Sequence, residues 1–289
     1  MKRLLVLAIS CLVYVGTEIG HSFARAMGER VPSRCVVLLY HGMPKEVTGR
    51  FAKQLDILGQ GATPVAADCR VPLQPLGDYV AVTFDDGLIS FVDNALPELQ
   101  RRRIPVTLFV VVGRLGAVPA WTRYSSETTW TSASSVPTGE RMLTAEELKR
   151  LKGKVLIGSH SLTHARLADL DADKLEEEVE GSRRQLERIM GEDVTLFSFP
   201  YGAFSQEVLN HCHGYRRVFT IEPTLAFSDP EEFVSGRVAV DPTDWSLEFW
   251  LKLKGCYRWL PYAVAAKRKL RDLLRVHGLS SSPETAKHG

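Results

Sequence analysis

Short apolar runs alternate with longer amphipathic segments along most of the chain after Arg34. Runs that are rich in Val, Ile and Phe and bounded by turn residues are typical of buried strands. The predicted strands are Val36–Tyr40, Val80–Phe84, Thr107–Val112, Val155–Ile157, Leu196–Phe199, Val218–Ile221 and Arg237–Val240. The predicted helices are Phe51–Leu58, Phe91–Arg102, Ala145–Leu151, Lys174–Met190 and Gln206–His211. This alternation predicts an α/β fold with a parallel sheet, either a barrel or a doubly wound sheet.

Two helix ends carry local signals. Thr144, with Glu147 three residues later, predicts a capping box, and Gly191 after Met190 predicts a helix stop. The alternation breaks once, over residues 116–141, which are rich in Ser, Thr and Pro. The aromatic residues of this loop are Trp121, Tyr124 and Trp130. They suit either stacking on sugar rings or a flap that packs on its own side chains.

The N-terminus has the layout of an export signal. Lys2 and Arg3 precede an apolar stretch from Leu4 to Gly16, which is shorter than the roughly 20 residues that span a bilayer. Ala24-Arg25-Ala26 offers a cleavage pattern, although it lies far from the apolar stretch. We therefore expect residues 1–26 to be a signal peptide or an uncleaved membrane anchor, and the protein to be exported or anchored in the cell envelope. A buried N-terminal helix is disfavoured because the stretch is apolar on every face.

Composition excludes some classes of protein and charge adds one feature. With 45% hydrophobic and 24% charged residues the chain is neither disordered nor a multi-span membrane protein. The net charge of +2 gives no indication of nucleic-acid binding. Residues 250–277, however, hold eight Lys and Arg against one Asp, interleaved with Trp and Tyr. Residues 246–289 are therefore expected to form a basic, aromatic segment that contacts a membrane surface or covers the barrel bottom as a solvated helix.

The five cysteines are scattered and include no C-x-x-C pair, which predicts free thiols, with a Cys35–Cys69 disulfide left open. Cys212 lies between two histidines, a grouping that could bind a metal ion. Three consecutive helical residues point in different directions, so a helix end before Gly214 is the favoured interpretation.

Polar groups follow several predicted strands at the point where each strand ends. They are His41, Asp85-Asp86-Gly87, His160 with His164, Pro200-Tyr201-Gly202 and Asp241. The carboxyl ends of parallel strands meet at one edge of the sheet, so these groups are expected to converge. Two histidines at i and i+4 with one carboxylate can bind one metal ion, and a second carboxylate can accept the proton of a water.

These motifs resemble those of a known family. Thr83–Gly87, His160–His164 and Pro200–Gly202 are similar to the first three motifs of the NodB-type polysaccharide deacetylases, carbohydrate esterase family four. The resemblance covers about residues 36–245 and implies a distorted (β/α)₇ TIM-like barrel over residues 34–245. Leu39–Gly42, and the phenylalanine-serine run before Pro200, resemble the branch of exopolysaccharide and poly-N-acetylglucosamine deacetylases.

The resemblance also implies roles for individual residues. Asp85 would be the general base, and Asp86, His160 and His164 would bind a divalent metal ion. Zinc suits this ligand set, and cobalt, nickel or manganese could replace it. The Tyr201 N–H would stabilise the oxyanion. Pro200 and Tyr201 would shape the acetate pocket, and Asp244 and Trp245 match the fourth motif of the family.

Two departures from the family pattern concern the base and the acid. Ser198 occupies the position of an arginine that orients the base, and Arg237 is the candidate replacement, with an ordinary ion pair as the alternative. The leucine-x-histidine that supplies the acid is absent, and His277 is out of register. His41 is the candidate acid, with a structural hydrogen bond as the alternative.

The predicted function is metal-dependent hydrolysis of N-acetyl groups on an amino-sugar polysaccharide or lipid-linked glycan, by a metal-activated water with Asp85 as base. An O-acetyl esterase would use the same ligands. A catalytically impaired glycan-binding or assembly protein is the alternative from another class, but it would have no need of Asp85. The chain contains no phosphate-binding glycine loop and no G-x-S-x-G elbow. The sequence predicts no oligomeric state.

Overall fold

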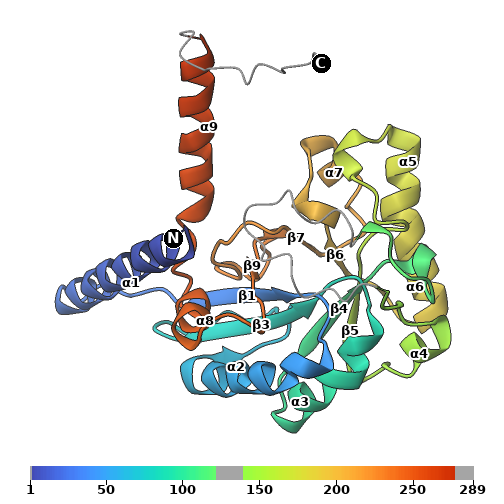
Figure 1. The fold of residues 1–289 in the computed structure, drawn as a ribbon, viewed down its shortest axis with the longest axis horizontal. Coiled ribbons are helices and arrows are strands. Elements are labelled where there is room, and N and C mark those ends of the chain that lie inside the picture. The colour runs from blue at the N-terminus through green and yellow to red at the C-terminus, as the bar shows by residue number, and fades with distance from the viewer. Residues whose placement is uncertain (1, 122–138, 277–289) are drawn as a thin grey trace, which may run out of the picture.

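The computed structural model describes residues 2–121 and 139–276, and they form one parallel sheet with helices around it (Figure 1). The strands are β1 (Arg34–Tyr40), β2 (Thr63–Pro64), β3 (Asp78–Phe84), β4 (Val106–Val110), β5 (Leu156–Ser159), β6 (Leu196–Ser198), β7 (Arg217–Phe219), β8 (Val234–Ser235) and β9 (Val238–Ala239). The α-helices are α1 (Lys2–Ala26), α2 (Thr48–Gly61), α3 (Leu96–Arg101), α4 (Ala145–Lys149), α5 (Ala172–Glu176), α6 (Ser182–Met190), α7 (Gln206–Asn210), α8 (Ser246–Leu253) and α9 (Leu260–Val276).

The sheet curls into the distorted barrel that the resemblance to the deacetylase family implies. Its strand order is β8-β7-β6-β5-β4-β3-β1-β9, with β2 beside β3, and every pair is parallel. Only Gly236 and Arg237 separate β8, which pairs with β7, from β9, which pairs with β1. One short stretch of chain therefore joins the two edges of the sheet and closes the barrel.

All seven strands predicted from the sequence are present, with ends that move by a few residues. The two-residue strands β2 and β8 carry no apolar run of their own and were not predicted. The predicted helix Phe91–Arg102 begins with a π-helical turn (Phe91–Ala95), and Lys174–Met190 contains another (Glu177–Gly181). The capping box at Thr144 and the helix stop at Gly191 are confirmed.

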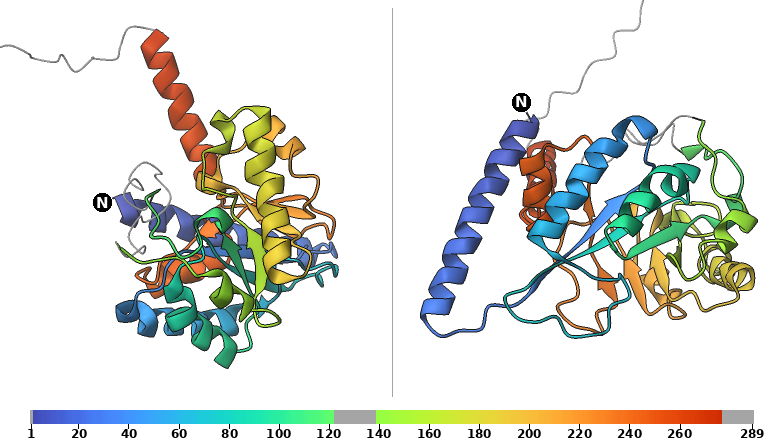
Figure 2. Two further views of the ribbon diagram at one scale, coloured as in Figure 1. Left: turned by 90° about the vertical axis from the view of Figure 1, so that its right-hand side faces the viewer. Right: turned by 90° about the horizontal axis from the view of Figure 1, so that it is seen from below.

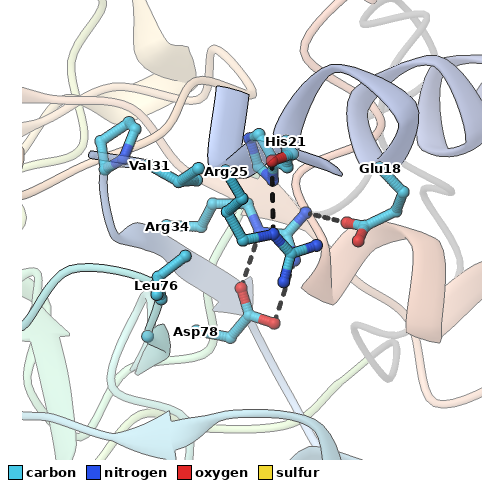
Figure 3. Close-up of a pocket in the computed structure, with 9 residues that line it drawn as sticks. Glu18, His21, Arg25, Val31, Arg34, Leu76 and Asp78 are labelled. Carbon is cyan, nitrogen blue, oxygen red and sulfur yellow. Dashed lines mark hydrogen bonds and ion pairs between the residues drawn. The ribbon is translucent and has the colours of Figure 1, made fainter. Parts of the chain in front are cut away.

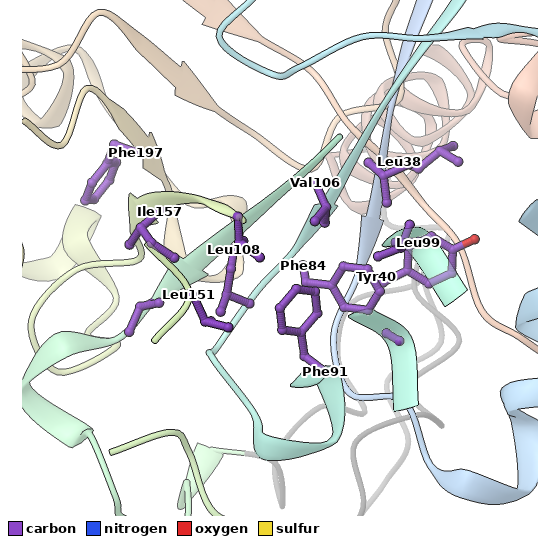
Figure 4. Close-up of a cluster of buried hydrophobic side chains, with 14 of the residues drawn as sticks. Leu38, Tyr40, Phe84, Phe91, Leu99, Val106, Leu108, Leu151, Ile157 and Phe197 are labelled. Carbon is purple, nitrogen blue, oxygen red and sulfur yellow. The ribbon is translucent and has the colours of Figure 1, made fainter. Parts of the chain in front are cut away.

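Alternation along the strands divides the core into two layers. Val36, Leu38 and Tyr40 of β1 pack toward the helices, where Tyr40 stacks on Phe84 with ring centroids 5.1 Å apart (Figure 4). Cys35 and Val37 belong instead to a smaller cluster inside the barrel. Because β1 and β3 are paired in register from Arg34 opposite Asp78 to Tyr40 opposite Phe84, the residues after both strands emerge side by side.

The cysteine predictions are confirmed. All five thiols are free, including Cys35 and Cys69. Cys212 is buried just beyond α7, and its thiol donates to the Val208 carbonyl at 3.3 Å, so it belongs to a helix end.

The two terminal helices lie outside the barrel. α8 packs against α2, and α1 runs alongside α8, whereas α9 projects away from the rest of the molecule (Figures 1 and 2). Within the described residues, α1 is the one helix that is long and apolar enough to cross a bilayer. It extends ten residues beyond the predicted apolar stretch, to Ala26.

Candidate active site

Four strands of the sheet position the predicted site. Asp85 and Asp86 directly follow β3, His160 follows β5, and Tyr201 follows β6, with His41 after β1. The Asp85 N–H donates to the Tyr40 carbonyl at 2.9 Å, which ties the turn after β3 to the end of β1. The expected convergence of these residues at the carboxyl ends of the strands is therefore observed.

Asp86, His160 and His164 form a compact buried group. One ligand atom from each lies within 4.8 Å of the other two. The Asp86 Oδ1 is 3.6 Å from the His164 Nε2 and 3.9 Å from the His160 Nε2. All three side chains are almost completely buried, so a polar ligand held between them would be shielded from bulk water.

The protonation of this group suits a divalent cation. The His160 Nδ1 lies 2.8 Å from the Ser198 carbonyl, an acceptor, so Nδ1 carries the proton and the lone pair of Nε2 faces Asp86. Burial lowers the pKa of His164 well below its ordinary value, which keeps this imidazole neutral. Burial also raises the pKa of Asp86. Two imidazoles beside a buried carboxylate are the donor set of an N/O metal site, and these residues fit such an ion.

The loops that carry the group adopt strained backbone conformations. Asp86, Ser161, His164 and Tyr201 all have positive φ values, between 60° and 73°. Non-glycine residues in this region cost on the order of 1–3 kcal/mol each and concentrate at functional sites. Two of these residues, Asp86 and His164, belong to the buried group itself, and the Ser161 hydroxyl accepts from the His164 N–H at 3.1 Å.

Glu178 supports the loop between the two histidines. Its Oε2 accepts hydrogen bonds from the Leu162 N–H at 3.0 Å and the Thr163 N–H at 2.9 Å, and its Oε1 accepts one from the Thr163 hydroxyl. Glu178 is buried within the π-helical turn between α5 and α6. Glu178 belongs to none of the sequence motifs described above.

Arg237 reaches Asp85 from the gap between β8 and β9. Its guanidinium donates to both carboxylate oxygens of Asp85, at 2.7 and 2.8 Å, and to the Ser198 hydroxyl at 2.6 Å. Further hydrogen bonds join it to the Thr83 hydroxyl and the Thr220 carbonyl. The family pattern has an arginine at the position of Ser198. Here the Arg237 side chain lies beside Ser198 and contacts the predicted base instead.

The charge of Asp85 depends on this contact. Burial alone would raise the pKa of Asp85, but Arg237, followed by His160, holds the pKa well below its usual range. Gly236 permits the approach, because a Cβ there would lie 2.1 Å from the Thr224 Oγ1 and 2.2 Å from the Glu222 carbonyl. The break in the last strand and its glycine therefore bring the guanidinium into the barrel.

Two aromatic rings flank His164. Trp121 stacks on the imidazole with centroids 4.3 Å apart at 11°, and its Nε1 donates to the Asp86 Oδ1 at 3.2 Å. Tyr201 packs edge-on against the same ring at 4.6 Å and remains 39% exposed. The sequence marks Trp121 only as an aromatic residue of a long polar loop. The other two aromatics of that loop, Tyr124 and Trp130, lie outside the described residues, as does His277.

The remaining predicted residues differ in their placement. His41 is partly buried and close enough to Asp85 and Asp86 to interact with both electrostatically. Asp244 instead pairs with Lys252 at 2.6 Å and accepts from the Asp241 N–H at 3.0 Å. Trp245 is 46% exposed and lies under the guanidinium of Arg3. The structure therefore connects the fourth-motif pair to α1 and α8 rather than to the Asp86 group.

Sequence comparisons relate the chain to known deacetylases. The family model for polysaccharide deacetylase matches residues 74–218. The polysaccharide deacetylase-like protein YxkH of Bacillus subtilis is 24% identical over 225 residues, 73% of each chain. A chitooligosaccharide deacetylase of Azorhizobium caulinodans is 28% identical over 132 residues, covering 45% of this chain and 51% of that protein.

Solved structures share the fold. IcaB from Ammonifex degensii superimposes with a TM-score of 0.62 and 25% identity, covering 79% of this chain and 98% of that one. The deacetylase PplD of Streptococcus pyogenes gives a TM-score of 0.57 at 17% identity, over 78% and 98% of the two chains. The chain belongs to the polysaccharide deacetylase family, a group of hydrolases that act on N-acetyl amide bonds.

Proposed function

We propose that the protein is a metal-dependent deacetylase that removes N-acetyl groups from an amino-sugar polysaccharide or lipid-linked glycan. The observation that carries this proposal is that a buried Asp-His-His group lies beside a second, ionised carboxylate. Asp86, His160 and His164 form a buried N/O group, while Asp85 beside them is held ionised by Arg237. A site that only bound glycan would have no need of this second carboxylate.

Asp86 would hold the ion through a carboxylate oxygen, and His160 and His164 through Nε2. An ion bound there supplies Lewis-acid polarisation of the carbonyl and a lowered pKa for water. Zinc suits the two imidazoles and one carboxylate, and cobalt, nickel or manganese would be accepted by the same donors.

Asp85 accepts the proton of the attacking water. Its Oδ2 is 3.6 Å from the His160 Nε2, so the carboxylate lies at the edge of the metal group. Both oxygens are also engaged by Arg237, which fixes the orientation of the carboxylate. Two hydrogen bonds from one guanidinium fix the plane of a carboxylate. Its remaining lone pairs then keep a constant direction, as a general base aligned with a water requires.

The groups around Asp85 would complete the reaction. The Tyr201 N–H donates no hydrogen bond to any described residue and is available to the oxyanion that forms on the acetyl carbonyl. Pro200 and the rings of Trp121 and Tyr201 form a wall for the acetyl group, and His41 would protonate the leaving amine. The exposed Trp245 would contact a more distant part of the glycan, and the buried side chain of Asp244, paired with Lys252, would hold the segment that carries it.

The same comparisons support the proposed substrate and location. The similarity to a chitooligosaccharide deacetylase and the fold shared with IcaB support an N-acetylated polymer or glycolipid. The domain assignment is residues 34–245 for the deacetylase domain, with 1–26 as signal or anchor and 246–289 as the basic segment. The apolar α1 supports a location in the cell envelope.

The test is release of acetate from N-acetylglucosamine oligomers after chelation and return of zinc. Asp85→Asn should reduce turnover at least about a hundredfold and leave bound metal unchanged, because the base is lost and the ligands remain. His160→Ala should reduce metal content instead. The matched controls are Asp169→Asn and His213→Ala, which alter exposed residues away from the site.

Three results would contradict the proposal. The first is an Asp85→Asn enzyme with the wild-type rate. The second is a His160→Ala chain with full metal content. Activity on O-acetylated but not N-acetylated glycans would replace the amide with an ester as the substrate.

A further inference from the structure

One side of α1 contacts the rest of the fold. Arg3 near its start donates to the Glu248 carboxylate at 2.6 Å. In its middle, the fully buried Ser10 hydroxyl accepts from the Trp259 Nε1 at 3.1 Å. Apolar side chains fill the contact between these points, where Val6, Leu7, Cys11, Val13 and Tyr14 pack with Trp250, Leu251, Cys256, Tyr257 and Leu260. α1 therefore has a polar and apolar inner edge, contrary to the expectation that it is apolar on every face.

The far end of α1 is also attached. The Thr17 hydroxyl accepts from Arg258 at 2.9 Å. Glu18 pairs with Arg34 at 2.7 Å, and Arg34 in turn pairs with Asp78 at 2.6 Å (Figure 3). Arg34 and Asp78 are the first residues of β1 and β3, so α1 runs along the barrel wall to the amino ends of these strands.

α1 could be cleaved off, cross a bilayer or stay against the barrel, and these three states differ in which contacts they keep. Cleavage after Ala26 would expose the apolar cluster around Leu251 and remove Glu18, one of the two partners of Arg34. A helix that crosses a bilayer alone would have to break every contact from Arg3 to Glu18. Only a retained helix that lies flat against the barrel keeps all of them.

The outer side of α1 is apolar and has no partner among the described residues. Its large exposed side chains are Leu4, Leu5, Leu12, Val15, Ile19 and Phe23, with exposed fractions from 51% to 72%. Leu5, Leu12 and Ile19 recur every seven residues, so they lie on one line of the helix. Soluble monomers seldom expose a continuous apolar patch of this length.

Cations lie on α9, a helix whose first turn is close to the start of α1 (Figure 1). α9 begins at Leu260, directly after Trp259, and leaves the molecule near the start of α1 (Figure 1). Lys267, Arg268, Lys269 and Arg271 of α9 are exposed, and residues 260–271 contain no acidic residue. A second copy of the chain would bring two such cationic helices together, whereas anionic headgroups would neutralise them.

We propose that the outer side of α1 and the cations of α9, here called the α1–α9 face, bind the surface of an anionic phospholipid bilayer. α1 remains in the mature chain and lies parallel to that surface, with its apolar side at the boundary of headgroups and acyl chains. The proposal requires no catalytic group, so it stands apart from the proposed function.

The experiment is cosedimentation of the full chain with vesicles of phosphatidylcholine, with and without phosphatidylglycerol. We expect binding that depends on phosphatidylglycerol and weakens at high salt. Leu12→Glu should weaken binding at least about tenfold, because a 72% exposed leucine enters the lipid boundary. Val71→Glu, which changes a 69% exposed apolar residue outside both helices, is the matched control and should bind as the wild type.

The cations are tested separately. Replacing Lys267, Arg268 and Lys269 together with Ser should reduce affinity for the anionic vesicles on the order of a hundredfold, at about 1 kcal/mol for each charge. Wild-type protein that stays in the supernatant, or Leu12→Glu that binds like Val71→Glu, would overturn the proposal. An intact mass that lacks residues 1–26, measured on chain purified from the producing cells, would overturn retention of α1.

Discussion

The arginine that pairs with Asp85 does not come from the position that the family pattern gives it. Ser198 ends β6, Arg237 lies between β8 and β9, and their side chains meet at 2.6 Å beside Asp85. The side chain at either position can therefore reach the same carboxylate. Two sequence-distant positions in a barrel can exchange such a role, because the strands bring their side chains to one point.

This exchange can be tested by moving the arginine. Arg237→Ser should reduce turnover by about a hundredfold, since a misoriented base loses its alignment with the attacking water. The double variant Arg237→Ser/Ser198→Arg should recover at least about tenfold of that loss. Steady-state acetate release measures both.

A control for burial is available in the same chain. Arg217 is also fully buried, but it donates only to backbone carbonyls, among them Glu232, Ala67 and Pro230. Arg217→Ser should lower thermal stability without reducing the rate per folded molecule. If the double variant is no faster than Arg237→Ser alone, the two positions are not interchangeable.

The residues of the site differ in how far they could be predicted from the sequence. Asp85, Asp86 and His160 follow long apolar strands, so the period of the pattern places them at the sheet edge. Trp121 carries no such signal, because it lies in an irregular loop whose path depends on contacts with His164. The contact of Arg237 with Asp85 spans 152 residues and depends on a strand break that no local pattern marks.

At the scale of elements, the π-helical turn between α5 and α6 determines the position of Glu178. A π turn widens the helix by one residue and often marks a functional position. Here it turns a glutamate inward, under the loop that carries His160 and His164. The amphipathic pattern of residues 174–190 predicts a continuous helix, and an inserted residue is invisible in that pattern.

Glu178→Gln should weaken metal binding about ten- to a hundredfold, because an amide accepts the loop hydrogen bonds less strongly and the ligand loop loses its orientation. The affinity is measured by competition with a chromophoric chelator. Glu177→Gln changes the exposed neighbour in the same turn and is the matched control.

Two further observations make this prediction sharper. Thr163→Val removes only the hydroxyl contact and should have a smaller effect in the same direction. If Glu178→Gln, folded by circular dichroism, binds metal as tightly as Glu177→Gln, the carboxylate does not position the ligand loop.

At the scale of the whole molecule, the fold depends on contacts between residues far apart in the chain, which the strand pattern does not predict. The barrel closes through residues 234–239, and α1 is held by partners that lie up to 249 residues away in the chain. The N-terminal segment, which the sequence predicts to be a signal peptide or anchor, contacts α8 and the residues around Leu251 along one side. Composition predicts the apolar character of α1, but only tertiary contacts show which side is covered.

Burial of thiols makes the stability of this unit sensitive to alkali. Burial raises the pKa of Cys212 to about 12 and that of Cys256 to about 11, from an ordinary value of 9.0. A thiol whose pKa is higher in the folded state stabilises the fold fully below the unfolded pKa. This contribution is lost as the pH rises from about 9 toward the folded value, since the unfolded chain releases the proton first.

The free energy of unfolding should therefore fall above pH 9, by up to about 1.4 kcal/mol per pH unit for each buried thiol. Urea unfolding between pH 7 and 10.5, in the presence of reductant, measures the slope. Cys212→Ala should reduce the slope although it lowers stability at pH 7 by removing a buried side chain. Cys69→Ala, at a partly buried position, is the matched control and should keep the wild-type slope. A Cys212→Ala chain with an unchanged slope would show that other groups, such as the buried tyrosines, determine the alkaline limit of the fold.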